Sequence, residues 1–437
     1  MASASAPLEP SEGSPDKLSL ALEPESAALY CHEMLKRKLV APYCDTPKEQ
    51  LTPHRYLIVD IGGGTVDISA HQVVNYVGSQ KYPVVEELHP PVGNDCGGMK
   101  VNQGFVTFLE RLVSDVGFSN FVETCDPEVD ARNNFDLNQV INVAFEEQKQ
   151  IFGRLEKHKR RDSVIRLPAT MVEMYQEELQ DGVETLGTSN VRLVRQSLRI
   201  SPSKMEELMQ KAMAGIFECI SDLLSTLSAS IDVIYLVGGF GGCPYVYWQF
   251  VKKFGDQYQI IVPPNPEFAV VEGAVLYRTN PSVVRARKAD ATYGKTVIRP
   301  FNEHIHDRRN KVVDDDNIPQ CYNLFQTIVE VGETINPDYV YMCTSIPVHH
   351  GQRNMSIEIY SSPKKADEVW YVSGEKSGSA LKIGELIVDM PVQRGDKLRE
   401  VEFTFDFSHT EIQVKGYDKT SRREVKTVVD FLSAQTE

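Results

Sequence analysis

Runs of apolar residues, some continuous and some alternating with polar residues, predict strands early in the chain. Residues 55–60 contain four consecutive apolar residues, Tyr56 to Val59, and are expected to form a short apolar strand. After three glycines, Val66, Ile68 and Ala70 alternate with polar neighbours, which is the period of a half-buried strand. A further buried strand is expected over 231–237. The first two strands are therefore joined by a glycine turn rather than by a helix.

Helical periodicity fills most of the sequence between these strands. Residues 101–159 are expected to be mostly helical, because apolar side chains recur there at helical spacing. Ser203 and Glu206 have the spacing of a capping box, which predicts the start of a helix that ends near residue 227. Three other helices are expected: 18–35, interrupted early by Pro24; one that starts at Tyr245; and 265–277.

The pattern changes to alternation after Pro281. Each alternating segment is short, and turn residues separate it from the next. The segments are 355–360, 383–390, 401–405, 411–414 and 425–429. The sequence therefore predicts a mixed α/β part followed by an all-β module of half-buried strands.

The net charge of the chain disfavours some classes of binding partner. The 437 residues include 46 Lys plus Arg and 61 Asp plus Glu, so the formal net charge is −15. An acidic surface repels nucleic acid and anionic membranes, so we expect neither as a partner.

Composition also predicts the compartment. No apolar run approaches the ~20 residues of a membrane helix, and the N-terminus lacks the pattern of a signal peptide. The eight cysteines include no Cys-x-x-Cys pair, which disfavours zinc and predicts reduced thiols in a cytoplasmic protein. Residues 1–17 are rich in small and polar residues and are expected to be disordered.

The glycine turn carries the strongest chemical signal in the sequence. Its consecutive glycines are Gly62, Gly63 and Gly64. Without Cβ atoms, the backbone can approach an anion closely and direct several amide protons at it, and Thr65 adds a hydroxyl donor. Asp60 and Asp67 would repel a phosphate directly, but they can hold one through a hydrated Mg²⁺. We therefore predict a phosphate site here rather than a plain hairpin turn.

A second glycine segment follows the strand expected at 231–237 and precedes a helix. The amides of Gly238, Gly239 and Phe240, with the helix N-terminus, could face a nucleotide. Taken alone, this segment is equally compatible with a tight packing turn. The hairpin is not a dinucleotide-binding fingerprint, because a strand follows it. The chain also has no Walker A loop, because Met99 stands where that motif needs lysine.

The order of these segments resembles that of the actin-like ATPases and, within them, the 70 kDa heat-shock protein family in its divergent type-12 branch. The hairpin resembles that family's second phosphate motif, and Gly238-Gly239 resembles its adenosine motif. Other segments between Leu22 and Leu432 also resemble family motifs: Glu23-Pro24-Glu25, Cys96-Gly97-Gly98, Glu146-x-x-Lys149, Asn265-Pro266-Glu267, Thr292-Tyr293-Gly294, Val401-Glu-Phe-Thr-Phe-Asp406 and Gly416-Tyr-Asp-Lys-Thr420.

The resemblance implies a fold and a domain order. Residues 18–283 are expected to form an actin-like (ribonuclease H-like) α/β nucleotide-binding lobe that is truncated at its N-terminus. Its core would comprise 55–97 and 198–283, and 98–197 would form a helical subdomain. Residues 284–437 are expected to form a β-sandwich like the family's peptide-binding domain, without its helical lid.

The resemblance also implies ligands and roles. ATP or ADP with Mg²⁺ would bind the lobe, and peptide or protein clients would bind the β-sandwich. Glu23, Asp60 and Asp67 would lie near the metal, with Asp60 and Asp67 holding it through water, and are the candidate catalytic groups. The expected nucleotide contacts are Gly62, Gly63, Gly64, Thr65, Gly98, Glu146, Lys149, Gly238, Gly239, Phe240 and Glu267.

Departures from the family pattern limit the expected activity. The family's first phosphate hairpin and its catalytic lysine should precede Glu23, and no such motif occurs there. Gly153 and Gly242 stand where the family has adenine contacts. We therefore expect nucleotide binding, with negligible hydrolysis by this chain alone, so whether it acts as an enzyme stays open. The alternative is a non-enzymatic scaffold or adaptor with a relic nucleotide lobe. A sugar kinase of the same superfamily is disfavoured by the all-β module.

Overall fold

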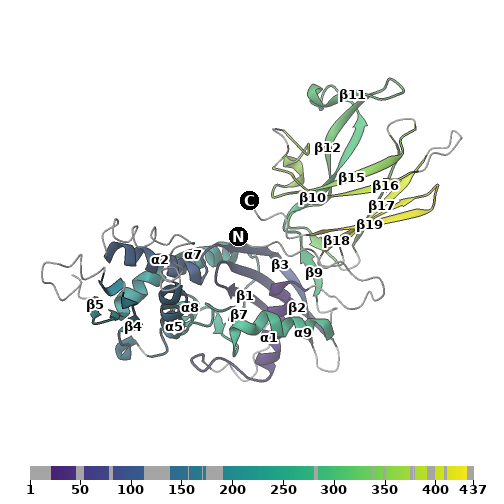
Figure 1. Ribbon diagram of the computed structural model, residues 1–437. Coiled ribbons are helices and arrows are strands. Elements are labelled where there is room, and N and C mark those ends of the chain that lie inside the picture. The colour runs from purple at the N-terminus through teal and green to yellow at the C-terminus, as the bar shows by residue number, and fades with distance from the viewer. Residues whose placement is uncertain are drawn as a thin grey trace.

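The structure is a computed structural model in which two parts of the chain are distinct (Figure 1). A mixed α/β part precedes an all-β part, as the sequence predicted. The residues that it describes are 21–45, 54–77, 82–112, 138–155, 157–169, 171–173, 190–279, 284–336, 339–347, 351–374, 377, 379–390, 399–407 and 411–430. The expectations for residues 1–17 and for the helical stretch 113–137 lie outside these ranges.

A seven-stranded sheet forms the centre of the α/β part. Its strand order is β13-β9-β3-β2-β1-β7-β8. Strands β1, β2 and β3 pair antiparallel in sequence, whereas β7 lies parallel to β1 on its other side. The bounds are β1 Arg55–Ile61, β2 Val66–Val77, β3 Tyr82–Asn94, β7 Val233–Val237, β8 Gln259–Ile261, β9 Val284–Lys288 and β13 Thr334–Ile335. The strands expected at 55–60, after the glycine turn and at 231–237 are thus confirmed.

Helices cover both faces of this sheet, which explains why β1 and β7 are continuous apolar runs. Leu57 and Val59 lie in one hydrophobic core with α7, whereas Tyr56 and Ile58 lie in another with α1 and α9. A strand buried on both faces has no polar side to show. The bounds of the helices that flank the sheet are α1 Glu23–Lys36, α7 Pro202–Thr226, α8 Pro244–Phe254 and α9 Ala269–Thr279.

A smaller helical region is inserted between β3 and α7. Helix α2 packs on a π-helix through Phe105 and Phe145, whose rings stack with centroids 4.0 Å apart. A three-stranded sheet of order β4-β6-β5 adjoins it. The elements are α2 Gly98–Leu112, the π-helix η1 Val140–Phe145, α5 Glu146–Ile151, η2 Lys157–Lys159, β4 Ser163–Arg166, β5 Val191–Val194 and β6 Ser197–Ile200.

Two expected helix starts were wrong. Pro24 does not interrupt α1 but stands in its first turn, where a missing amide proton costs nothing. The N-cap of α7 is Ser201 rather than Ser203: the Oγ of Ser201 accepts a hydrogen bond from the amide of Lys204 at 3.3 Å. Glu206 forms an ion pair with Arg160 instead of closing a capping box.

Replacing Ser201 by alanine is expected to lower the free energy of unfolding by about 1 kcal/mol, because one amide at the start of α7 loses its acceptor. Urea unfolding followed by circular dichroism measures the loss. Ser203→Ala is the control, since the Oγ of Ser203 hydrogen-bonds the side chains of Ser201 and Asn190, whereas the amide of Lys204 donates to Ser201. A larger loss for Ser203→Ala than for Ser201→Ala would contradict the assignment.

The C-terminal part consists of two antiparallel sheets around one hydrophobic core, and we call it the two-sheet module. The five alternating segments predicted from the sequence are confirmed as β15 to β19, whereas β10, β11, β12 and β14 were not expected. The five-stranded sheet comprises β10 Thr292–Pro300, β11 Lys311–Val313, β12 Pro319–Val329, β15 Asn354–Ser362 and β16 Leu381–Asp389. The four-stranded sheet comprises β14 Val340–Ser345, β17 Val401–Asp406, β18 Glu411–Asp418 and β19 Arg423–Asp430.

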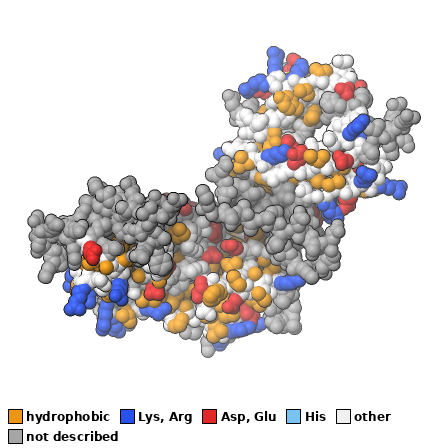
Figure 2. All heavy atoms as spheres, in the orientation of Figure 1, with side chains coloured by type: hydrophobic (Ala, Val, Ile, Leu, Met, Phe, Trp, Pro, Cys, Tyr) orange, Lys and Arg blue, Asp and Glu red, His pale blue; other side chains and the backbone are white. Residues whose placement is uncertain are grey.

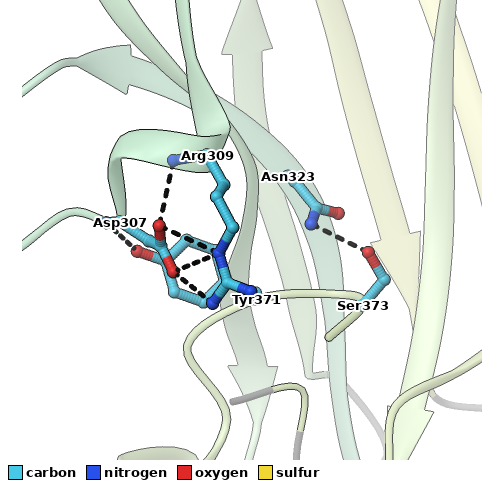
Figure 3. Close-up of polar contacts among 5 residues, drawn as sticks. All are labelled: Asp307, Arg309, Asn323, Tyr371 and Ser373. Carbon is cyan, nitrogen blue, oxygen red and sulfur yellow. Dashed lines mark hydrogen bonds and ion pairs between the residues drawn. The ribbon is translucent and has the colours of Figure 1, made fainter. Parts of the chain in front are cut away.

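Polar side chains hold the long connection between β10 and β12 in place (Figure 3). Asp307 caps the short helix η5 Arg308–Asn310 by accepting from the amide of Arg309, and its own amide donates to the hydroxyl of Tyr371 at 2.9 Å. Asn323 donates to the Oγ of Ser373 at 2.9 Å. Asn323 lies in β12, so both the connection and β12 are tied to the segment that follows the short helix η6 Ala366–Glu368.

Strand β9 joins the two parts of the chain. It pairs in parallel with β3 and antiparallel with β13, which follows β12 of the two-sheet module. The amide of Lys288 donates to the buried carboxylate of Glu87 at 2.7 Å. Arg287 makes a bidentate ion pair with Glu25 of α1, with N···O distances of 2.6 and 3.1 Å. The domain boundary expected at residue 284 thus falls at the start of a strand of the central sheet.

The outer surface of α9 is unusually apolar. Figure 2 shows apolar side chains on the face over α1 and α9, where Val271 and Val275 are 66% and 67% exposed. Phe268, in the preceding turn, is also exposed.

Within the described ranges, none of the helices combines the length and hydropathy that crossing a bilayer requires.

Candidate phosphate-binding site

The glycine turn closes the β1–β2 hairpin with a backbone hydrogen bond from the amide of Gly62 to the carbonyl of Thr65 at 3.0 Å. Asp60 and Asp67 are paired directly across the two strands. The Oγ1 of Thr65 donates to Oδ2 of Asp67 at 2.9 Å. The two carboxylates and the hydroxyl expected at this site are therefore brought together at the base of the turn.

The carbonyl oxygens of the glycine turn accept hydrogen bonds from amides at the N-terminus of α2. The amides of Gly97, Gly98 and Met99 donate to the carbonyls of Gly64, Gly62 and Gly63 at 3.1, 3.0 and 2.7 Å. Carbonyl oxygens repel phosphate oxygens, so engaging them in hydrogen bonds lowers the electrostatic cost of an anion at the turn.

The second glycine segment packs against the hairpin, backbone to backbone. The carbonyl of Ile61 accepts hydrogen bonds from the amides of Phe240 and Gly241, at 2.9 and 3.1 Å. Gly238 has φ +83°, and a Cβ there would collide with Asp60 and with the carbonyl of Ile61. Only glycine fits such a position. The two glycine motifs, far apart in sequence, thus form one site.

Five glycines of this site fall into two groups. At Gly97 and Gly238 a side chain would collide with neighbouring backbone, so packing explains the glycine. At Gly63, Gly64 and Gly239 a Cβ would meet nothing within 4 Å, and none of the three has a positive φ. Among the described residues, no atom lies within 4 Å of the Cβ position of these three glycines, so a ligand can approach their backbone closely.

Three carboxylates adjoin the turn. Burial, and then the negative charges of Glu23 and Asp67, raise the pKa of Asp60 to about 6. Such a group gains from a nearby cation, since a positive charge offsets both causes of the shift. No cluster of three or more His, Cys, Asp or Glu side chains within the described ranges has the arrangement of direct metal ligation. The donor set fits a hydrated Mg²⁺, which keeps several waters and needs few protein ligands.

Glu146 and Lys149, which were expected to contact the nucleotide, form an ion pair with each other. The Nζ of Lys149 lies 2.6 Å from Oε2 of Glu146, and also donates to the carbonyl of Gly98 and to Oδ1 of Asn102. Lys149 is only 2% exposed. Burial alone would raise the pKa of Glu146, but hydrogen bonds from Lys149 and Asn102 outweigh it and lower that pKa. Asn102 was missed by sequence reasoning, because its partners lie on another helix.

The remaining expected residues lie around these groups. A Cβ on Gly98 would lie 3.0 Å from the Nζ of Lys149 and 3.2 Å from Cβ of Phe240, so these three pack together. Glu267 is exposed in the short helix η3 Pro266–Phe268. The amide of Gly238 donates to the carbonyl of Pro266 at 2.9 Å, which fixes η3 beside the second glycine segment.

Comparison with known proteins gives one consistent group of relatives. No family model matches the chain. It is 28% identical to mouse heat shock 70 kDa protein 12A over an alignment of 472 residues, which covers 96% of this chain and 66% of the relative. The identities to human heat shock 70 kDa proteins 12A and 12B are 27% and 26%, with the same coverage. The chain thus spans about two thirds of the length of these relatives. These matches, together with the joined glycine motifs, make the chain similar to the type-12 branch of the 70 kDa heat-shock protein family.

Proposed function

We propose that this chain binds ATP or ADP with Mg²⁺ at the glycine turn. The observation that carries the proposal is the open space beside Gly63, Gly64 and Gly239, on backbone that is otherwise tightly packed. The phosphates would lie against the amides of the turn and the hydroxyl of Thr65. The family relationship supports a nucleotide as the ligand.

The metal would belong beside the carboxylates of the turn. Asp60 and Asp67 would hold Mg²⁺ through water, with Glu23 nearby, and the ion would neutralise phosphate charge. Hydrolysis also needs positive charge on the transferred phosphoryl group, which proteins commonly supply with lysine or arginine. The candidate cation of this site, Lys149, is buried and already bound to Glu146, Gly98 and Asn102. We therefore propose binding with negligible turnover by this chain alone.

The two-sheet module is the proposed site for peptides or protein clients. Edge strand β14 has one neighbour, β17, and its outward residues Val340 and Met342 are exposed, as is Ile346 just beyond it. An edge with an apolar outward face can accept an extended segment of another chain. The net charge of −15 makes nucleic acid and anionic membranes unsuitable partners.

Gly63→Val tests the nucleotide proposal. Wild-type protein is expected to gain about 2.7 kcal/mol of stability at a nucleotide concentration 100 times the dissociation constant. The valine should remove that gain by occupying the space beside the turn, while leaving the ligand-free melting temperature unchanged, because its Cβ meets nothing within 4 Å. Calorimetric melting with and without Mg-ADP measures both quantities.

The matched control is Gly104→Ala in the middle of α2, where a Cβ would meet only the carbonyl of Leu208 at 3.8 Å. This variant should retain the full shift with Mg-ADP. Undiminished nucleotide binding by Gly63→Val would remove the glycine turn as the binding site.

A scaffold or adaptor without nucleotide is the second candidate function. The closed network of Glu146, Lys149 and Asn102 favours it, because these side chains satisfy one another and need no ligand. If neither Mg-ATP nor Mg-ADP shifts the melting of wild-type protein, this second function replaces the first.

A further inference from the structure

A lysine lies inside the two-sheet module. Lys295 follows Tyr293 on the same face of β10, and that face lines the core between the two sheets. Lys295 is only 4% exposed. Lysine is rarely buried without a carboxylate, because the desolvated ammonium needs a counter-charge. The group that contacts the buried amine of Lys295 therefore indicates what this lysine can do.

That partner is a thiol on the opposite sheet. The Nζ of Lys295 lies 2.9 Å from Sγ of Cys343, which belongs to β14. Among the described residues, Cys343 is the side chain that forms a hydrogen bond with the Nζ of Lys295. Cys343 is half-buried, and its strand β14 is at the edge of its sheet. A small oxidant can therefore reach the partly exposed Cys343, while the amine of Lys295 contacts its sulfur.

We propose that Lys295 and Cys343 form an oxidation-dependent covalent cross-link between the two sheets. The chemistry begins at sulfur, with hydrogen peroxide as the oxidant. The Cys343 thiolate attacks one peroxide oxygen, so that an S–O bond forms, the O–O bond breaks, and the leaving hydroxide takes a proton to become water. Sulfur is oxidised by two electrons to a sulfenic acid, and the peroxide is reduced.

The amine then displaces the new oxygen. The unprotonated Nζ of Lys295 attacks Sγ, an N–S bond forms, and the S–O bond breaks. The departing hydroxide takes a proton from nitrogen, which releases a second water. This condensation parallels the known reaction of sulfenic acids with nitrogen to give a sulfenamide, and a thiol reductant reverses it. The starting contact of 2.9 Å means that no backbone movement is needed to bring the two atoms together.

The bond would tie β10 to β14 across the core. These strands belong to different sheets, and the two residues are 48 positions apart. Closing a loop of that length removes conformations from the unfolded chain and resists separation of the sheets. The two-sheet module would thus exist in a reduced form and a covalently locked form, independently of any nucleotide.

Peptide mass spectrometry of the peroxide-treated full chain tests the cross-link. We expect a linked pair of peptides, one containing Lys295 and the other Cys343, that has lost two hydrogen atoms relative to the separate peptides. Treatment with dithiothreitol should abolish the pair. Protein unfolded in urea before oxidation should not give it, because the contact depends on the fold.

Three controls identify the reacting atoms. Lys295→Met keeps a long side chain in the core and should abolish the pair, leaving Cys343 as a sulfenic or higher acid. Cys343→Ser should abolish it as well. Cys219 of α7 is half-buried beside Asp222 and should oxidise without linking to lysine. Oxidation of Cys343 to free acids in folded wild-type protein, with Lys295 unmodified, would overturn the proposal. A cross-link that persists in Lys295→Met would overturn it equally.

Discussion

Glu25→Ala is expected to lower the free energy of unfolding by about 3–5 kcal/mol, the range observed when one partner of a buried ion pair is removed. Glu25 is 2% exposed, and both of its carboxylate oxygens bind Arg287. The alanine would leave a guanidinium largely buried without that counter-charge. Because Arg287 lies in β9, the loss should also weaken the attachment of the two-sheet module to the central sheet. Chemical denaturation measures the first effect, and hydrogen exchange at β9 measures the second.

Two variants separate charge from packing at this pair. Glu25→Leu combined with Arg287→Met should recover most of the loss, because apolar replacement of both partners leaves no buried charge. Glu368→Ala removes an ion pair with Lys364 in which both side chains are 53% exposed, and should cost less than about 1 kcal/mol. A loss of that small size for Glu25→Ala would show that the pair contributes no more than a surface contact.

Acid is expected to destabilise the α/β part through two buried histidines, His32 of α1 and His71 of β2. Burial lowers the pKa of His71 to about 3, with a further contribution from His32. Burial lowers the pKa of His32 to about 4. Among the described residues, nothing hydrogen-bonds either ring nitrogen of His71 or Nε2 of His32, which are buried, nor the buried hydroxyls of Tyr56 and Tyr235 beside them.

The lowered pKa values of the two histidines determine how the stability of the fold changes with pH. The unfolded chain binds a proton at each histidine near pH 6.5, whereas the folded chain does not until pH 4 or 3. The stabilising contribution is therefore complete above pH 6.5 and is lost as pH falls. At pH 5 the loss is about 2 kcal/mol for each histidine.

The titration of two carboxyl groups opposes this loss of stability in acid. Variants are therefore needed to isolate the contribution of the histidines. Burial raises the pKa of Glu87 to about 8, and Asp60 behaves similarly at about 6. Their protonation in the folded state increases stability as pH falls. Between pH 7 and pH 5, a His32→Leu, His71→Leu double variant should lose about 4 kcal/mol less stability than wild type. Parallel stability profiles for the two proteins in urea titrations would refute the histidine contribution.

The local sequence was sufficient to predict the turn and its flanking strands. Residues 56–59 are apolar, three glycines follow Ile61, and alternation begins at Val66, so both the strands and the sharp connection between them are encoded within a dozen positions. The same holds for α8, where Pro244 begins the helix directly after the second glycine segment.

Features that depend on distant partners were not predictable in this way. Glu146 and Lys149 have a spacing that suits ligand binding, but Asn102 and Gly98 of another helix draw Lys149 into the core. Strand β13 is two residues long and exists because β9 lies beside it. Ser201 and Ser203 are equally good caps by residue type, and only the backbone shows which accepts the amide of Lys204.

The parallel pairing of β1 with β7 has a consequence for how the chain is made. β1 ends at residue 61, and β7 begins only at residue 233, so 233 − 61 = 172 positions separate them. At ~5–20 residues per second, a ribosome takes roughly 10 to 35 seconds to cover that interval. During that time the largely apolar strand β1 has no β7 to pair with, and an unpaired strand edge can pair with other chains. Strand β1, whose residues Tyr56 and Val59 are fully buried in the finished sheet, therefore depends on protection of this edge while the protein is being synthesised.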